Sequence, residues 1–267
     1  MSWRRFLCAC LLAGAAAGAW AAAPPPSTVY LEELTWTELR DLVASGKTIA
    51  IVPVGGTEQS GPHMALGKHN ARVRFLAGRI AASLGNALVA PVITYVPEGT
   101  VNPPSAHMRF PGTITIPDAA FETTLEYAAR SLRLAGFRDV VLIGDHGGYQ
   151  ANLEHVAARL NREWAASPVR VHAVLEYYRA ADREYAQALE REGHKASEIG
   201  THAGLADTAL TLAVDPKLVR ADKLRNGGPA EGVHGDPRSA TVELGKTGLD
   251  IIVARTCDAI RRDTARH

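Results

Sequence analysis

The sequence predicts one α/β domain built on a largely parallel sheet, and three observations lead to this prediction. Short apolar runs rich in β-branched residues recur along the chain, as in strands that are buried on both faces. Segments with apolar residues at helical spacing lie between these runs, and strands alternating with helices are typical of a parallel sheet covered on both faces. No repeat and no second composition regime divides the 267 residues.

Each expected element follows from a local signal. Thr35, with Glu38 three residues later, has the pattern of a capping box and predicts a helix through Ala44. Pro117 and Asp118 open a helix that a glycine at 136 ends. The other expected helices are 70–84, 150–164, 178–193, 206–214 and 239–262. The expected strands are 48–54, 87–95, 113–116, 140–143 and 169–175.

The first residues have the layout of a secretory signal peptide. Two arginines precede an apolar run that is too short to span a bilayer, and Ala19-Trp20-Ala21 forms a small-x-small cleavage site. We expect a signal peptide at 1–21, a Pro-rich leader at 22–30 and one domain at 31–267. The mature protein is then exported to the periplasm or secreted, with no stable membrane span. Lipidation of Cys8 or Cys10 stays open.

Composition excludes several classes of protein. Lys plus Arg is 29 and Asp plus Glu is 28, so the formal net charge of +1 lacks the basic excess of a nucleic-acid binder. Apolar residues make up 46% and charged residues 21%, as in a soluble globular protein. After signal cleavage Cys257 is the remaining cysteine, so an internal disulfide is excluded and a buried structural thiol is expected.

Acids and histidines gather in glycine-rich loops after the predicted strands. The loop 55–63 follows one strand, the loop 144–149 follows another, and the segment 201–207 opens a later helix. Parallel sheets collect their chemistry at the carboxyl ends of the strands, so these segments form the expected site. The candidate residues in and beside them are Glu58, His69, Asp145, His146, Tyr149, His202 and Asp207.

Histidine and carboxylate side chains from separate loops suit one divalent metal ion. Zinc accepts imidazole nitrogen and carboxylate oxygen, and a catalytic zinc keeps three protein ligands and an open position. Such an ion lowers the pKa of its water to about 7. The chain has ten histidines, and a structural role in a loop or cap stays open for each of them.

Several segments resemble motifs of the creatininase (creatinine amidohydrolase) family, in order from about residue 35 to 262. The resemblance implies a three-layer α/β/α sandwich, usually a homo-hexamer, that hydrolyses a C–N bond of a small-molecule amide with one or two divalent metals. The matching segments are PVGGTEQSGPH at 53–63, FPGTI at 110–114, GFR at 136–138, HGG at 146–148, HAG at 202–204 with Asp207-Thr208, and GVHGDPRSAT at 232–241.

The resemblance assigns roles to individual residues and also reveals departures. Glu58 and His146 fall on metal ligands, and His202 falls on a histidine associated with proton transfer. Four positions depart from the family pattern: Ser60 replaces a ligand histidine, His69 replaces a metal-bridging aspartate, Asp145 replaces a glycine, and Asp207 replaces a glutamate.

These departures predict one metal ion rather than two. A carboxylate can bridge two cations, whereas a neutral imidazole offers one lone pair to one metal. Glu58, His69 and His146 then form a two-histidine, one-carboxylate set for Zn²⁺, with Mn²⁺ or Fe²⁺ as alternatives. Asp145 and Asp207 stay open as a fourth ligand, as a hydrogen-bond partner of a ligating imidazole, or as a general base.

The predicted mechanism is metal-assisted hydrolysis of an amide. The metal polarises the carbonyl and activates water, Asp207 or Asp145 accepts a proton, and His202 stabilises charge or delivers a proton to the leaving nitrogen.

Three residues are expected to contact the substrate. His107 and Arg109 precede the FPGT segment, and Tyr149 ends the loop after a predicted strand. Arg109 is chosen because a guanidinium binds a carboxylate through a two-point fork. A surface ion pair stays open for Arg109, and an exposed loop position without substrate contact stays open for His107.

Two other functions stay open. The loss of two usual ligand positions leaves room for a non-catalytic exported small-molecule binding protein on the same fold. A metal-dependent lyase or isomerase on this scaffold is the other alternative. Creatinine itself is not the favoured substrate, because its turnover is usually intracellular and this chain carries an export signal.

Overall fold

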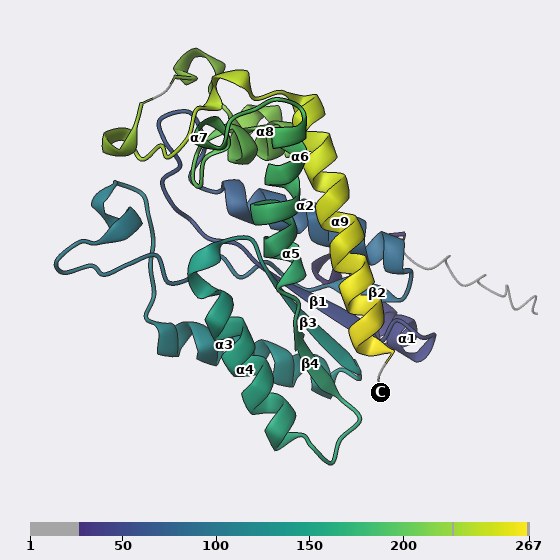
Figure 1. Cartoon of the computed structure of the whole chain (residues 1–267). Helices are drawn as coiled ribbons and strands as arrows, with labels where there is room; N and C mark the ends of the chain where they lie inside the picture. The colour runs from purple at the N-terminus through teal and green to yellow at the C-terminus, as the bar shows by residue number, and fades with distance from the viewer. Residues whose placement is uncertain (1–26, 226, 266–267) are drawn as a thin grey trace, which may run out of the picture.

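The computed structural model describes residues 27–225 and 227–265. Their centre is a parallel sheet of four strands in the order β2-β1-β3-β4 (Figure 1). The strands are β1 (Ile49–Val54), β2 (Ala87–Val89), β3 (Asp139–Gly144) and β4 (Arg170–Ala173). The crossover helices are α2 (Lys68–Leu84), α3 (Asp118–Leu134) and α4 (Gln150–Glu163). The expected signal peptide and most of the leader lie outside the described residues.

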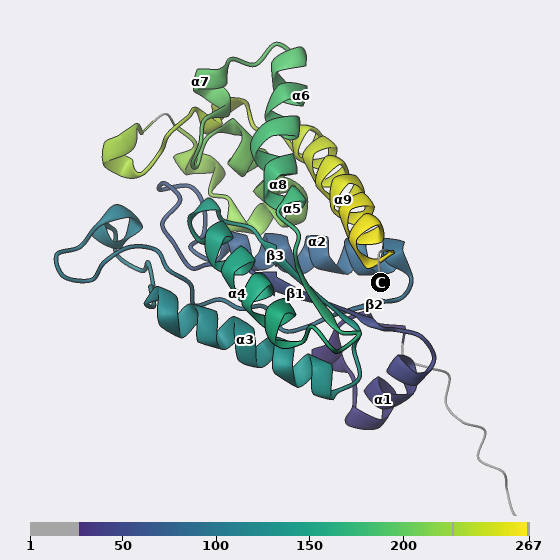
Figure 2. The same cartoon turned by 60° about the horizontal axis from the view of Figure 1, so that its bottom comes forward.

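Side chains alternate across the sheet, and each face has its own apolar core. Ile49 and Ile51 of β1 pack with α2 and with α9 (Val242–Thr264). Ala50 and Val52 point to the other face, which α1 (Trp36–Ala44), α3 and α4 cover. Figure 2 shows α3 and α4 on one side of the strands and α2 with α9 on the other. The predicted three-layer α/β/α sandwich is confirmed.

The predicted first helix is confirmed together with its cap. The Thr35 backbone N–H donates to Glu38 Oε2 at 2.7 Å, and the Glu38 N–H donates to Thr35 Oγ1 at 3.3 Å. This reciprocal pair satisfies two backbone donors that the first helical turn leaves free.

Two predicted strands differ in the structure. The strand expected at 87–95 ends at Val89, and only an isolated bridge from Val54 to Ile93 continues its pairing. Pro91 lies in between and has no N–H to donate to a ladder. The segment 113–116 is not a strand among the described residues, because its pairing is a single bridge from Thr115 to Val96.

The helix expected at 178–193 is interrupted. It consists of α5 (Glu176–Arg179), a π-helical turn (Ala180–Tyr185) and α6 (Ala186–Arg191). Helices α7 (Ala196–Ile199) and α8 (Leu205–Val214) follow. π-Helical turns are frequent at functional sites, and this one contributes residues to the cavity described below.

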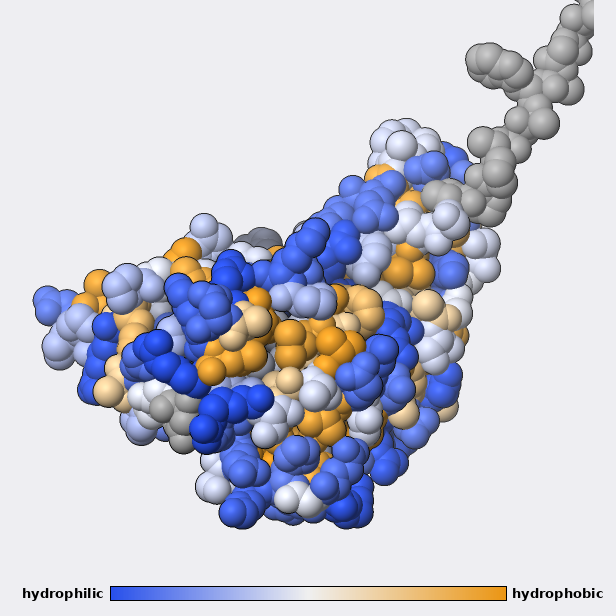
Figure 3. All heavy atoms as spheres, turned by 90° about the horizontal axis from the view of Figure 1, so that it is seen from above, coloured by the Kyte–Doolittle hydropathy of each residue, from blue (hydrophilic) through white to orange (hydrophobic). Residues whose placement is uncertain are grey.

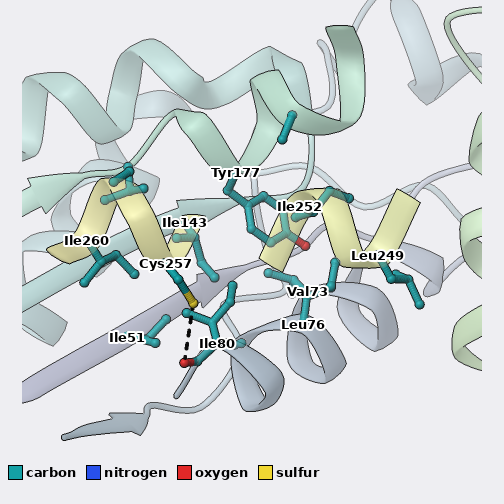
Figure 4. Packing of buried hydrophobic residues seen from close by; sticks show 14 of the residues in the cluster. Ile51, Val73, Leu76, Ile80, Ile143, Tyr177, Leu249, Ile252, Cys257 and Ile260 are labelled. Carbon is teal, nitrogen blue, oxygen red and sulfur yellow. Dashed lines mark hydrogen bonds between the residues drawn. The ribbon is translucent and has the colours of Figure 1, made fainter. Parts of the chain in front are cut away.

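Cys257 lies on α9 inside the apolar core and is 2% exposed, which confirms the expected structural thiol. Figure 4 shows its sulfur among isoleucines of the sheet and of α2, and its Sγ lies 3.9 Å from the carbonyl oxygen of Ile80. Burial raises the pKa of the thiol, so it is a poor nucleophile.

The surface is not uniformly polar. Seen from above, the face in Figure 3 has an apolar area near its middle, with hydrophilic residues around it. Within residues 27–225 and 227–265, no helix has both the length and the apolar character needed to cross a membrane.

Candidate active site

Two neighbouring strands bring the predicted loops together. Val54 at the end of β1 pairs with Gly144 at the end of β3, so the loops that follow them lie side by side. A Cβ on Gly55 would meet Asn70 Oδ1 at 2.1 Å, which requires glycine where the first loop passes α2. The Gly56 N–H donates to the same oxygen at 2.9 Å and fixes the turn that leads to Glu58.

Four side chains converge at this edge of the sheet. Ligand atoms of Glu58, Glu98, His107 and His146 all lie within 4.8 Å of one another. Glu58 Oε2 is 3.2 Å from His107 Nε2 and 3.5 Å from His146 Nε2, and Glu98 Oε2 is 3.8 Å from His146 Nε2. We call these residues the four-ligand cluster.

Three of the four carboxyl oxygens of the four-ligand cluster are buried without a hydrogen-bond partner among the described residues. Glu58 Oε2 and both oxygens of Glu98 make no hydrogen bond with the described residues. Burial and the neighbouring Glu58 carboxylate raise the pKa of Glu98 to about 9. A bound cation would let both carboxyls ionise, because it offsets their repulsion and their loss of water. The residues therefore fit a divalent metal ion.

The histidines of the cluster are suited to the same ion. Burial lowers the pKa of His146 to about 4, and burial also lowers the pKa of His107. Both imidazoles are therefore neutral near pH 7 and have a lone pair available, as metal coordination requires.

His69 lies beside the cluster rather than in it. Its Nε2 is 2.7 Å from Glu58 Oε1 and its Nδ1 is 2.6 Å from Asp145 Oδ2, so each ring nitrogen faces a carboxylate. The geometry thus gives His69 the role of holding Glu58 in place, and the group of converging ligand atoms contains Glu98 and His107 instead of His69.

Asp145 and Asp207 belong to a buried ion-pair network. Arg72 bonds Asp145 at 2.9 Å and Asp207 at 2.8 Å, and Lys68 Nζ bonds Asp207 at 2.6 Å. Despite burial, which raises it, the pKa of Asp145 is lowered by Arg72. The pKa of Asp207 is likewise held well below its ordinary value by Lys68 and Arg72 against the effect of burial. Arg72 and Lys68 engage both oxygens of each carboxylate, so the geometry disfavours the proton-accepting role expected for either.

His202 faces the cluster from the start of α8. Its Nε2 is 3.0 Å from the main-chain oxygen of Gln59 and 3.1 Å from the side-chain nitrogen of the same residue. Its Nδ1 is 3.8 Å from Glu58 Oε1, so the ring stands beside the metal-binding carboxylate. Burial lowers the pKa of His202 to about 3. The next residue, Ala203, has a φ of 55°, a strained value that is common at functional sites.

Tyr149 holds the main chain of the loops after β1 and β3 in place. This corrects the expectation that it contacts the substrate. It is fully buried, and its hydroxyl donates to the carbonyl oxygens of Val54 and Gly55 at 2.8 and 2.6 Å. The same oxygen accepts from the N–H groups of Asp145 and His146 at 3.1 Å. All its hydrogen-bonding capacity is therefore used by the main chain.

Two cavities adjoin the cluster. The first, of about 300 Å³, is lined by cluster, network and π-helical residues, among them His146, His202 and Asp182. The second, of about 620 Å³, is lined by residues that include Gln59, Arg109, Pro229 and Gly232. His107 and His234 line both cavities.

The sequence analysis missed Glu98 and the cations of the network. Glu98 follows the predicted strand 87–95 in a Pro-Glu-Gly segment, the same signal that singled out Glu58. Lys68 and Arg72 carried no such signal, because a lysine and an arginine on a helix are ordinarily exposed. In the structure both are nearly fully buried.

Known proteins resemble the chain over almost its whole described length. The model of the family "Creatininase: Creatinine amidohydrolase" matches residues 32–260. Creatinine amidohydrolase of Pseudomonas putida is 29% identical over 88% of this chain and 97% of its own. The mycofactocin precursor peptide peptidase of Mycolicibacterium smegmatis is 29% identical over 80% of this chain and 85% of its own.

The solved structures include similar folds. A glutamate-to-glutamine mutant of creatininase, described as of the Zn–Zn type, superimposes with a TM-score of 0.72 at 27% identity. The match covers 90% of this chain and 99% of that one.

Proposed function

Because the chain belongs to the creatininase family, we propose that it is a metal-dependent hydrolase that cleaves a C–N bond of a small amide. The observation that carries the proposal is the convergence of two buried carboxyls and two neutral imidazoles, with three carboxyl oxygens lacking a hydrogen-bond partner among the described residues. The similarity to an amidohydrolase and to a peptidase supports the reaction class, since both names describe hydrolysis of a C–N bond.

We propose Glu58, Glu98, His107 and His146 as the residues that hold one divalent metal, and Zn²⁺ as that metal. The bound metal would supply a Lewis acid that polarises an amide carbonyl and makes a water molecule more nucleophilic. A second ion is disfavoured because His69 uses both ring nitrogens on carboxylates, and Ser60 stands where the family has a ligand histidine.

We assign the other roles in the reaction to side chains of the protein. His202 faces the cluster, and a neutral imidazole has a lone pair on one ring nitrogen, so we assign it the transfer of a proton from the attacking water to the leaving nitrogen. His69 holds Glu58, and Asp145 in turn holds His69. Lys68 and Arg72 neutralise the buried acids around this chain of contacts, which keeps the site fixed.

The test is the metal content of the purified protein and of matched variants. We expect about one zinc, manganese or iron per chain, and little in Glu58→Ala or His146→Ala. Glu98→Gln should weaken metal binding by at least about tenfold, because even partners outside the ligand set contribute 10–100-fold. His69→Gln should lower activity more than metal affinity, and exposed Glu190→Gln is the matched control.

Each other outcome counts against a stated part of the proposal. Two tightly bound ions per chain would overturn the single-metal site. Metal loss in His69→Gln with retention in Glu98→Gln would restore the ligand set predicted from the sequence. No metal after incubation with each ion would overturn the hydrolase and favour the small-molecule binding protein.

A further inference from the structure

The four-ligand cluster lies where two cavities meet. His107 is a member of the cluster and lines both cavities. His146 and His202 lie on the first cavity, and Arg109 and Phe110 lie on the second. A carbonyl that reacts at the cluster would therefore have the first cavity beside His146 and His107, and the second beside His107, to receive the two halves of an amide.

The charges of the two cavities differ. The first cavity has two buried cations, and both are neutralised: Lys68 by Asp207, and Arg72 by Asp145 and Asp207. Arg109 is the cation of the second cavity, and it forms no ion pair with any residue that the structure describes. No aspartate or glutamate is among the described residues that line this cavity. Its walls therefore carry one free positive charge.

The size of the site also favours an extended ligand. The first cavity, at about 300 Å³, is at the lower end of the range for small-molecule sites, which is roughly 300–1,000 Å³. A compact cyclic amide fits within such a volume and leaves the second cavity, of about 620 Å³, unused.

We propose that the substrate is an extended amide whose reacting carbonyl lies at the junction and whose carboxylate is bound by Arg109 in the second cavity. This inference rests on the proposed hydrolase function and adds the chemical class of the substrate. Arg109 is then a specificity-determining residue. It lies on the turn Ala106–Arg109, which also carries His107, so the same turn positions a metal ligand and the carboxylate anchor.

Binding to the zinc-loaded protein tests the inference independently of turnover. The probes are the N-benzoyl derivatives of glycine, β-alanine and 4-aminobutyrate, each compared with its own carboxamide by titration calorimetry. At least one carboxylate should bind about tenfold or more tightly than its carboxamide, because a guanidinium–carboxylate pair is a strong, two-point contact. Arg109→Gln should abolish this difference, and Arg109→Lys should restore part of it.

Arg191→Gln is the matched control, since it removes one exposed arginine from α6, outside both cavities. If any of these probes is hydrolysed, Arg109→Gln should raise KM for the carboxylate while kcat changes little. Equal binding of every pair, absence of binding by every carboxylate, or a preference that persists in Arg109→Gln overturns the inference.

The two proposals fail in different ways. If the metal-loaded protein hydrolyses amides without regard to Arg109, the substrate class is wrong and the hydrolase stands. If carboxylates bind through Arg109 in a protein that takes up none of the metal ions, the hydrolase fails and the anion site stands.

Discussion

Asp207 lies between two buried cations and connects them to the main chain. Its carboxylate bonds Lys68 and Arg72, and Oδ2 also accepts the N–H of Ala203 at 3.0 Å. Removing the charge leaves both cations without this partner, and unpaired buried charges are costly. Asp207 is thus a residue whose contribution to stability can be measured apart from activity.

We predict that Asp207→Asn lowers the free energy of unfolding by about 3 kcal/mol at pH 7. The pKa of Asp207 is lowered in the folded protein, so its contribution is fully present above the pKa of the unfolded chain, about 3.9, and is lost as the pH falls through the folded value. The difference between wild type and variant should therefore shrink below about pH 4.

Urea unfolding at several pH values measures this difference. Asp250→Asn is the matched control, because Asp250 pairs with Arg79 at 2.9 Å on the exposed surface and should contribute less than about 1 kcal/mol. Equal effects of the two substitutions would contradict the assigned network.

At the scale of elements, α1 depends on its first turn. The helix packs onto the sheet through Leu39, Leu42 and Val43, and the Thr35–Glu38 capping box fixes where it begins. The cap is exposed, and neither Thr35 nor Glu38 lines a cavity of the candidate site. Substitutions in the cap therefore test the stability of α1 alone.

Thr35→Ala should lower the free energy of unfolding by about 1 kcal/mol, because it removes the side-chain acceptor for the Glu38 N–H. Thr35→Ser keeps the hydroxyl and should keep the stability. Denaturant unfolding of the three proteins decides the matter, and a loss of the same size in both variants would show that the cap is not the cause.

Elements with strong local signals were predictable, and those that depend on distant contacts were not. The capped α1 and the buried β1 and β3 appear where pattern and propensity place them. The π-helical turn in 180–185 was not predictable, because its apolar spacing is that of an ordinary helix. The segment 113–116 has β-branched residues, yet its pairing with Val96 depends on the path of the preceding loop.

The candidate site shows the same difference between features with a local sequence signal and features that depend on distant contacts. Glu58, His146 and His202 follow from loop position and motif, and the structure brings them together. The sequence did not predict that both ring nitrogens of His69 contact carboxylates. One of these contacts is with Asp145, which lies 76 residues further along the chain. The lack of an ion-pair partner for Arg109 among the described residues likewise depends on where the charged side chains lie in the fold, which the sequence does not give.

At the scale of the whole molecule, export remains our proposal. The apolar run and the Ala19-Trp20-Ala21 site predict cleavage after Ala21. Protein recovered from the periplasm or the medium should therefore begin at Ala22, as N-terminal sequencing or intact mass would measure. Ala21→Tyr should block processing, because the peptidase requires a small residue there. An unprocessed wild-type chain that stays in the cytoplasm would contradict export.

The meeting of two cavities at one turn has a consequence for how such proteins diverge. The second cavity is built largely from the loop 229–234 and the turn 106–110, and neither belongs to the sheet. Apart from His107, positions in these two segments can change without altering Glu58, His146 or the ion pairs behind them. The part of the substrate that binds in the second cavity can therefore differ between related proteins that keep the same residues for bond cleavage.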